Sequence, residues 1–125
     1  MNADKLTEAA ANGDTERVQF LLENGIAPNA VNRFGRTPIQ VMMMGNTKIA
    51  QLLLLYGANP NISDSSTGLT PVHDAAREGF LDTVMVLVRN SANTNVRDGR
   101  NLLPIDLARE NGHGDVIAFL ESNNF

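Results

Sequence analysis

Residues 68–79 read GLTPVHDAAREG, and this stretch is the clearest copy of a unit that recurs along the chain. A step of 33 residues from Pro71 lands on Pro38 in one direction and on Pro104 in the other. Self-similarity at a fixed period of this length predicts an array of stacked repeats, in which each unit contacts its neighbours. The repeat period therefore indicates the type of fold before any single helix is considered.

The same stretch carries a full set of helix start and stop signals. Thr70 is a typical N-cap residue, and Pro71 then takes the first helical position, where its missing N–H costs nothing. His73 follows the cap by three residues, the position from which a side chain bonds back toward the start of the helix. Gly79 ends the helix because glycine tolerates the left-handed conformation. Each of these residues thus has a structural task.

The pattern Thr-Pro-x-His followed by two alanines resembles the ankyrin repeat. The resemblance implies an all-α solenoid of four helix-turn-helix repeats joined by extended hairpin loops. The length of 125 residues predicts a single ankyrin-repeat domain over residues 1–125. Its repeats are expected at approximately residues 1–31, 32–63, 64–97 and 98–125.

Within these repeats the helix signals set approximate bounds. Helices are expected near residues 4–12, 15–23, 39–44, 72–78, 81–89 and 115–121. In the helix at 81–89, the residues expected to face the core are Val84, Leu87 and Val88. Repeat four has Leu103 where the threonine would stand, so its hydroxyl cap is missing.

Repeat two departs from the pattern in its first helix. Gly45 follows Thr37 after eight residues, where repeat three takes nine between the equivalent positions. The helix at 39–44 is therefore expected to be one residue short and to survive only as a turn or a tightened 3₁₀ segment. The three adjacent methionines at residues 42–44 cannot all face the core of so short an element. At least one of them is predicted to be exposed.

Composition excludes several classes of function. The net charge is −4 with no basic cluster, which speaks against binding to nucleic acid or to an anionic membrane. The absence of cysteine excludes disulfides and thiolate metal sites and suits a reducing compartment. The amino-terminal residues lack the apolar run of a signal peptide. The composition thus predicts a soluble intracellular protein that needs no cofactor or metal.

No enzyme motif is present in the chain. There is no phosphate-binding glycine loop, no metalloprotease helix motif and no cysteine nucleophile. His73 beside Asp74 suggests a catalytic dyad, but no nucleophile stands in register with it. A histidine that holds the start of the helix is the favoured interpretation, and the chain is predicted not to be an enzyme.

Binding to another protein is the function that remains, because stacked repeats expose a long face of loops and inner helices. Asp74, Arg77 and Glu78 lie on the first helix of repeat three. Two interpretations of these charges are open: a surface ion pair between the first two at i, i+3, or a charged anchor for a partner.

Three apolar residues and one loop residue extend the list of candidates. Core filling and partner contact are equally open for Met42 and Met43, since methionine adapts to either. Phe80 follows the turn at the end of the helix and is predicted to be an exposed aromatic anchor. Asp64 lies in the loop before the helix, where aspartate usually forms a turn.

Three stretches narrow the resemblance to a particular family. Residues 35–45 read GRTPIQVMMMG, residues 52–61 read LLLLYGANPN, and residues 71–83 read PVHDAAREGFLDT. Together they resemble the four-repeat ankyrin inhibitors of cyclin-dependent kinases four and six, a resemblance that spans essentially the whole chain. Residues 32–35, Asn-Arg-Phe-Gly, look most like the b-type members.

The resemblance implies an inhibitor without catalysis that is a monomer when free and is found in the cytoplasm and nucleus. Such an inhibitor binds the kinase subunit beside its cleft, opposes the binding of cyclin D and restrains G1/S progression, as a tumour suppressor does. A generic ankyrin adaptor with another partner is the alternative. The partner-binding residues implied are Asp74, which would meet a basic residue of the kinase, with Arg77, Asp64, Met42, Met43 and Phe80.

Overall fold

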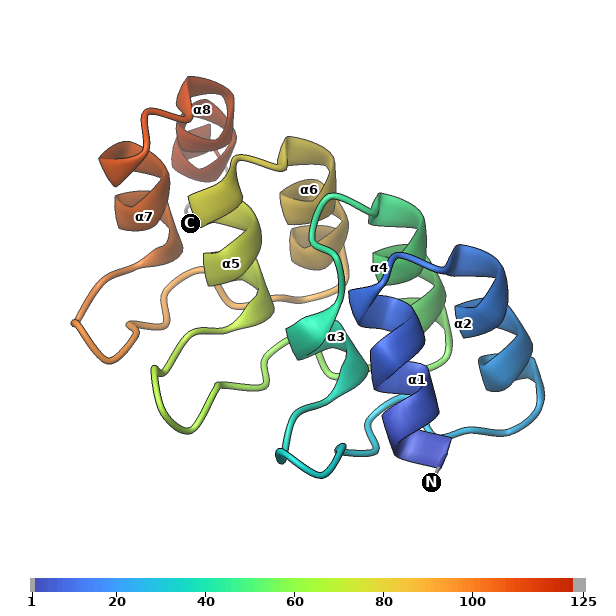
Figure 1. Ribbon diagram of the computed structural model, residues 1–125. Coiled ribbons are helices and arrows are strands. Elements are labelled where there is room, and N and C mark those ends of the chain that lie inside the picture. The colour runs from blue at the N-terminus through green and yellow to red at the C-terminus, as the bar shows by residue number, and fades with distance from the viewer. Residues whose placement is uncertain (1, 123–125) are drawn as a thin grey trace. The chain divides into compact units, whose positions relative to one another are not determined.

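The computed structural model of the chain describes residues 2–122, and all the regular structure in this range is helical (Figure 1). The all-α prediction is confirmed. Residues 1 and 123–125, at the outer limits of the predicted first and last repeats, lie outside the described residues. The helices are α1 Asn2–Ala11, α2 Thr15–Glu23, α3 Pro38–Val41, α4 Thr47–Leu55, α5 Pro71–Glu78, α6 Leu81–Arg89, α7 Pro104–Glu110 and α8 Gly114–Ser122.

The helices form two compact units that divide between Asn59 and Pro60. In the first unit, α1 packs against α2 and α3, and α4 packs against α2 and α3. In the second unit, α5 packs against α6 and α7, and α8 packs against α6 and α7. Each unit thus holds two helix-turn-helix pairs. The assignment of residues 1–125 to a single domain stays a prediction. No helix within residues 2–122 is both long and apolar enough to cross a membrane.

Three helices, α3, α5 and α7, begin with the same N-terminal capping arrangement. The third residue of the helix accepts a hydrogen bond from the backbone N–H of the N-cap residue, and a proline occupies the first helical position. The three bonds run from Thr37 N–H to Gln40 Oε1 (2.8 Å), from Thr70 N–H to His73 Nδ1 (3.2 Å) and from Leu103 N–H to Asp106 Oδ2 (2.9 Å). Asp106 thus supplies a bond at the start of α7, where the threonine is missing.

The core of each unit is aliphatic. Side chains with no exposed surface include Leu6, Ile39, Ile49 and Leu53 in the first unit and Val72, Val84, Leu87 and Val116 in the second. The prediction for Val88 is wrong, since this residue is only half-buried, while Thr83 and Val86 are buried instead. The buried stripe of α6 runs along one side of the helix, and at 100° per residue Val88 lies well away from its centre.

The first helix of repeat two is even shorter than predicted. It spans four residues, and its C-cap Met42 already has an extended ψ of 155°. The next residue, Met43, donates its N–H to the Ala10 carbonyl at the end of α1 (2.9 Å). The prediction of an exposed methionine is confirmed, because the side chain of Met43 is 49% exposed while those of Met42 and Met44 are 3% and 9% exposed.

The loops between repeats are held by asparagines in repeat register. In the first unit the Asn29 amide donates to the Gly57 carbonyl (3.0 Å) and accepts from the Asn59 N–H (2.7 Å). In the second unit Asn61 makes the equivalent two bonds to backbone groups 30 and 32 residues further along the chain. Each such side chain ties the loop of one repeat to the loop of the next, and so positions the residues that follow.

Candidate protein-binding face

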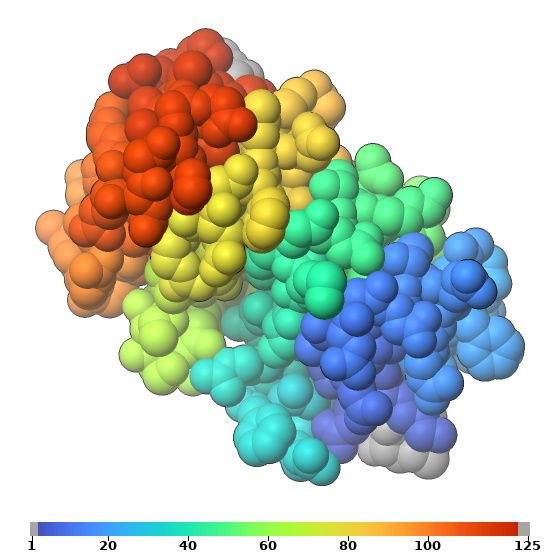
Figure 2. Space-filling view, turned by 45° about the horizontal axis from the view of Figure 1, so that its top comes forward, coloured from blue at the N-terminus to red at the C-terminus, as the bar shows by residue number. Residues whose placement is uncertain are grey.

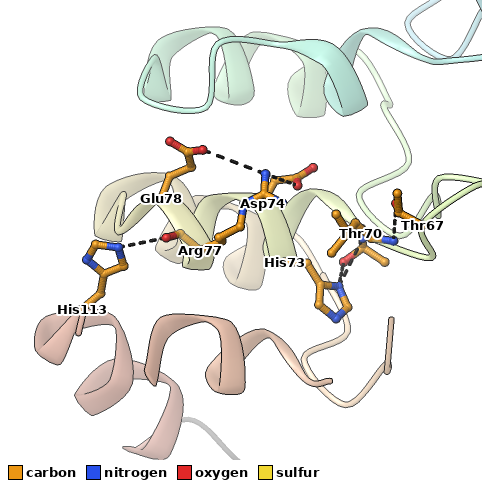
Figure 3. Close-up of polar contacts among 8 residues, drawn as sticks. Thr67, Thr70, His73, Asp74, Arg77, Glu78 and His113 are labelled. Carbon is orange, nitrogen blue, oxygen red and sulfur yellow. Dashed lines mark hydrogen bonds and ion pairs between the residues drawn. The ribbon is translucent and has the colours of Figure 1, made fainter. Parts of the chain in front are cut away.

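The charged cluster of the second unit lies on α5. Asp74 Oδ1 accepts a hydrogen bond from Nη2 of Arg77 (3.0 Å), and the same nitrogen lies 3.9 Å from Oε1 of Glu78 (Figure 3). Residues three apart on a helix are neighbours on its surface, so the helix itself brings the first pair together. The i, i+3 ion pair, one of the two interpretations left open by the sequence, is formed in the free chain.

The Asp74 carboxylate is the less exposed partner of this pair. Its side chain is 20% exposed, whereas that of Arg77 is 41% exposed. The pKa of Asp74 is raised to about 6, chiefly by burial; the Arg77 cation opposes the shift, and the negative charges of Asp64 and Glu78 add to it. A carboxylate in this setting lacks part of its hydration, and a single cation does not make up the loss. It is therefore suited to binding a second positive group.

Asp64 shapes the loop that precedes α5. Its Oδ1 atom accepts hydrogen bonds from the Ser66 N–H (2.8 Å) and the Ser66 hydroxyl (2.6 Å). Its backbone N–H donates to the Leu69 carbonyl (2.8 Å), which closes the loop. Asp64 is thus the turn-former that its residue type suggests. Its negative charge also contributes to the raised pKa of Asp74.

A groove of about 440 Å³ lies beside this cluster in the second unit. Figure 2 shows the loop before α5, in yellow-green, on the molecular surface. The Gly99 N–H donates to the Thr67 carbonyl (2.7 Å), so the loops before α5 and α7 are joined near their tips. The residues that line the groove are Ser66, Thr67, Leu69, Arg77, Asp98, Gly99, Arg100, Leu107 and Glu110.

Of the groove residues, the sequence pointed only to Arg77. Arg100 pairs with Glu110 at 3.0 Å, and a Cβ atom on Gly68 would lie 2.7 Å from the Gly99 nitrogen. The two glycines therefore permit the close approach of the two loops. The positions of these glycines at the turns of consecutive repeats were the sequence signal that could have indicated this close approach. The partners of Arg100 had no such signal, because they depend on tertiary packing.

Phe80 is the N-cap residue of α6 and its side chain is exposed. Its backbone N–H donates to the Ala75 carbonyl (3.0 Å) across the turn at Gly79. The predicted exposure of this aromatic ring is confirmed. Its role as an anchor for a partner stays a prediction.

The methionine candidates belong to the first unit. The burial of Met42 favours core filling for that residue, and the exposure of Met43 leaves partner contact open for it. The six candidates therefore form two sets: Met42 and Met43 in the first unit, and Asp64, Asp74, Arg77 and Phe80 in the second.

His73 and Asp74 point to opposite sides of α5 (Figure 3). The His73 ring is fully buried, with Nδ1 2.8 Å from the Thr70 hydroxyl and Nε2 3.0 Å from the Leu102 carbonyl. A carbonyl only accepts, so Nε2 carries the proton and Nδ1 accepts from the Thr70 N–H. Burial lowers the pKa of His73, which keeps the ring neutral. The ring is thus bound to backbone groups and does not pair with Asp74.

His113 likewise has a structural place. Its Nε2 atom lies 2.9 Å from the Arg77 carbonyl, where it donates a hydrogen bond at the end of α5. The ring covers Gly79, and a Cβ atom there would lie 2.5 Å from Nδ1. Gly79 has a φ of +81°, so it serves both the turn and this contact.

Comparison with known proteins agrees with this fold. The family model described as "Ankyrin repeats (3 copies)" matches residues 6–98 and 41–124. The helix pairs and the asparagine-linked loops are therefore those of an ankyrin-repeat protein, and the predicted fold class is confirmed.

Curated relatives define a narrower family. The chain is 61% identical to the cyclin-dependent kinase inhibitor 2A of Monodelphis domestica over 95% of its own length and 70% of the relative. It is 58% identical to the cyclin-dependent kinase 4 inhibitor B of Rattus norvegicus and to that of Homo sapiens, over 94% of its length and 90% and 85% of theirs. The chain belongs to the family of ankyrin-repeat cyclin-dependent kinase inhibitors.

Proposed function

We propose that this chain inhibits cyclin-dependent kinase 4 by binding the kinase subunit. The observation that carries the proposal is identity of 58% over 94% of the chain to proteins named as inhibitors of that kinase. The second unit supports it, because α5 carries a mostly buried carboxylate beside a groove lined in part by charged residues. The proposal requires no bond-making or bond-breaking step by the chain itself.

Asp74 is the central contact in this proposal. In the free chain it has one cation, Arg77, and burial opposes its ionisation. A lysine or arginine of the kinase would add a second positive charge and hold the carboxylate ionised in a site that excludes water. Phe80 and the groove supply apolar and polar surface around this contact, and Met43 supplies an adaptable apolar contact from the first unit.

Inhibition then follows from preference for one form of the kinase. If the chain binds a kinase conformation that has low affinity for cyclin D, cyclin D in turn lowers the affinity of the chain, because such coupling is reciprocal. The proposal extends to kinase six as a second target, to a monomeric free inhibitor and to action in the cytoplasm and nucleus, where it restrains passage from G1 to S.

Substitution of Asp74 by asparagine tests the proposed contact. The Asp74→Asn variant keeps the size of the side chain and removes the charge, so affinity for kinase 4 should fall by roughly 2–5 kcal/mol. Asp82→Asn on α6 is the matched control, since that carboxylate is exposed, and it should bind as the unchanged chain does. Titration of labelled kinase with each variant gives the affinities. Normal binding by Asp74→Asn would reduce this residue to a surface ion pair.

A kinase panel tests the function as a whole. The chain should bind kinases four and six and leave the cell-cycle kinase two unaffected, measured by phosphorylation of a protein substrate with increasing inhibitor. Equal inhibition of all three kinases, or of none, would refute the proposal in favour of an adaptor with a different partner.

A further inference from the structure

The three methionines after α3 differ sharply in their surroundings. Met42 and Met44 are buried, and only Met43 presents its side chain to solvent. Figure 1 shows α3 beside α1, with the chain after α3 running along the end of α1. Three chemically identical thioethers at consecutive positions therefore differ in their access to a reagent in water.

Met43 is also the residue that attaches the end of α3 to the end of α1. Its N–H donates to the Ala10 carbonyl (2.9 Å), and its own carbonyl accepts from the Asn46 N–H (2.9 Å). Its sulfur lies against the turn at Gly13, since a Cβ atom on that glycine would be 2.8 Å from Sδ and 3.1 Å from Cε. Met43 is thus about half exposed as a residue, while the sulfur end of its side chain also packs on the turn.

We propose that Met43 is an oxidation-sensitive site, at which a peroxide forms the sulfoxide in preference to its two neighbours and loosens the attachment of α3 to α1. The sulfur lone pair attacks one oxygen of hydrogen peroxide, and the S–O bond forms as the O–O bond breaks. The proton on the attacked oxygen passes to the departing hydroxide, which leaves as water. The sulfur is oxidised by two electrons and the peroxide is reduced. Sulfoxide reductases reverse this reaction.

The expected consequence follows from the contact with Gly13. A sulfoxide oxygen is polar and needs a hydrogen-bond donor, whereas the sulfur now packs closely against the backbone of the turn at Gly13. The four-residue helix α3 has few backbone bonds of its own, so the contacts of Met43 add to those of the buried Ile39 and Met42 in holding this segment. Met43 also belongs to the predicted partner contacts, and a weaker affinity for kinase 4 on oxidation therefore rests on the proposed function.

The first measurement locates the oxidised residue without any partner. The folded chain is treated with hydrogen peroxide, digested with trypsin and sequenced by tandem mass spectrometry; residues 37–48 form one peptide that contains all three methionines. Sulfoxide should appear at Met43 at least about tenfold faster than at Met42 or Met44. Equal rates at the three positions would overturn the proposal, and the same comparison in urea should abolish the difference.

The second measurement reads the effect on the fold. Oxidation to one sulfoxide should lower Tm by about 2–4 °C, and treatment with sulfoxide reductases should restore it. Met43→Leu keeps an apolar side chain of similar volume and should lose this sensitivity, whereas Met85→Leu, at the half-buried methionine of α6, should retain it. An unchanged Tm in protein fully oxidised at Met43 would refute the loosening.

The kinase assay separates this inference from the proposed function. If the untreated chain binds kinase 4, oxidised chain should bind at least about threefold more weakly and Met43→Leu should bind equally before and after peroxide. If the untreated chain does not bind the kinase, the proposed function fails, and the mass spectrometry and melting results still decide the oxidation site.

Discussion

The first helices of repeats two and three begin alike and end differently. Both start with Thr-Pro, and in both the third helical residue accepts a hydrogen bond from the threonine N–H. However, α5 runs for eight residues to a left-handed Gly79, whereas α3 stops after four. A shared start signal thus determines where a helix begins, and the residues that follow determine how long it lasts.

The side chain of the third helical residue, Gln40 in α3 and His73 in α5, is a second difference between the two helices. Gln40 is only half-buried, and its Oε1 atom bonds to the N–H and hydroxyl of Thr37, at 2.8 and 3.3 Å. His73 is fully buried and bonds both to Thr70 and to the carbonyl of Leu102, 29 residues away. The histidine therefore joins two repeats of the second unit, while the glutamine acts at the start of its own helix. Four predictions would break or sharpen this comparison.

The largest effect is expected from removing the third-position side chain. His73→Ala should lower the free energy of unfolding by about 3 kcal/mol, because it leaves a cavity and deprives the Leu102 carbonyl and the Thr70 N–H of partners. Gln40→Ala, the matched change in repeat two, should cost about 1 kcal/mol. Urea unfolding of both variants gives the two values. Equal losses would mean that the link to Leu102 adds nothing to the local cap.

The next largest effect is expected from alanine substitutions of the glycines that follow the first helices of repeats one and three. Gly79 and Gly13 both have a positive φ, of +81° and +72°. Gly79→Ala should cost about 2–3 kcal/mol, because the new Cβ atom displaces the His113 ring from the Arg77 carbonyl as well as straining the backbone. Gly13→Ala should cost about 1 kcal/mol, since the flexible end of Met43 can move away.

Gly25→Ala provides the reference for backbone strain alone. This residue has a φ of +88°, and within residues 2–122 no other side chain or backbone lies within 4 Å of the position that a Cβ atom would take. A loss for Gly79→Ala no larger than that for Gly25→Ala, in thermal melts of the two variants, would show that the His113 contact carries no stability.

At Asp74 a smaller change in the free energy of unfolding is expected, and here the substitution should stabilise the chain. Its folded pKa, about 6, lies above the ordinary value of 3.8, so ionisation costs the folded state more than the unfolded state. The unchanged chain is therefore more stable while Asp74 is protonated, and it loses this stability as the pH rises from about 4 to 6. Asp74→Asn has no such charge, and above pH 7 it should be more stable by about 1–2 kcal/mol.

The pH series isolates this effect. The difference between Asp74→Asn and the unchanged chain should be near zero below pH 4 and level off above pH 6, in urea unfolding at constant salt. The lowered pKa of His73 works in the other direction, with stability lost as pH falls below 6.5, but it is present in both proteins and cancels in the difference. A variant less stable than the unchanged chain at pH 7.5 would contradict the prediction.

The last prediction concerns local opening of the chain and needs no substitution. Amides of α3 should exchange with solvent about tenfold or more faster than those of α5, because a four-residue helix opens at little cost. Native-state hydrogen exchange resolved by NMR compares the two helices directly. Stronger protection in α3 would show that its tertiary contacts outweigh its length.

Local signals predicted the helices well. The bounds expected for residues 15–23 and 81–89 are those of α2 and α6. These segments have a turn residue before and after them and an apolar stripe of the right period, so local information suffices. The length of α3 was harder, because the count of residues indicated one missing position, while the packing of Met43 on Ala10 takes all of residues 42–44 out of the helix.

Only the part of the candidate site that depends on local sequence was predicted. The pair of Asp74 and Arg77 follows from helix geometry and is formed. The groove that includes Arg100 and the contacts of Met43 join segments about 30 residues apart, and the burial that raises the pKa of Asp74 is likewise a property of the folded chain. A pattern within one repeat contains no information on which neighbour covers which side chain.

The sequence by itself thus determined the repeat period, the all-α ankyrin class, the starts of α3 and α5 to within one residue and the family, because each rests on residue types at fixed local spacing. Tertiary structure alone decided that His73 is a link between repeats, that Asp74 is a partly desolvated carboxylate and that Met43 is the exposed methionine. Each of these depends on burial, and burial is set by the packing of one repeat on the next.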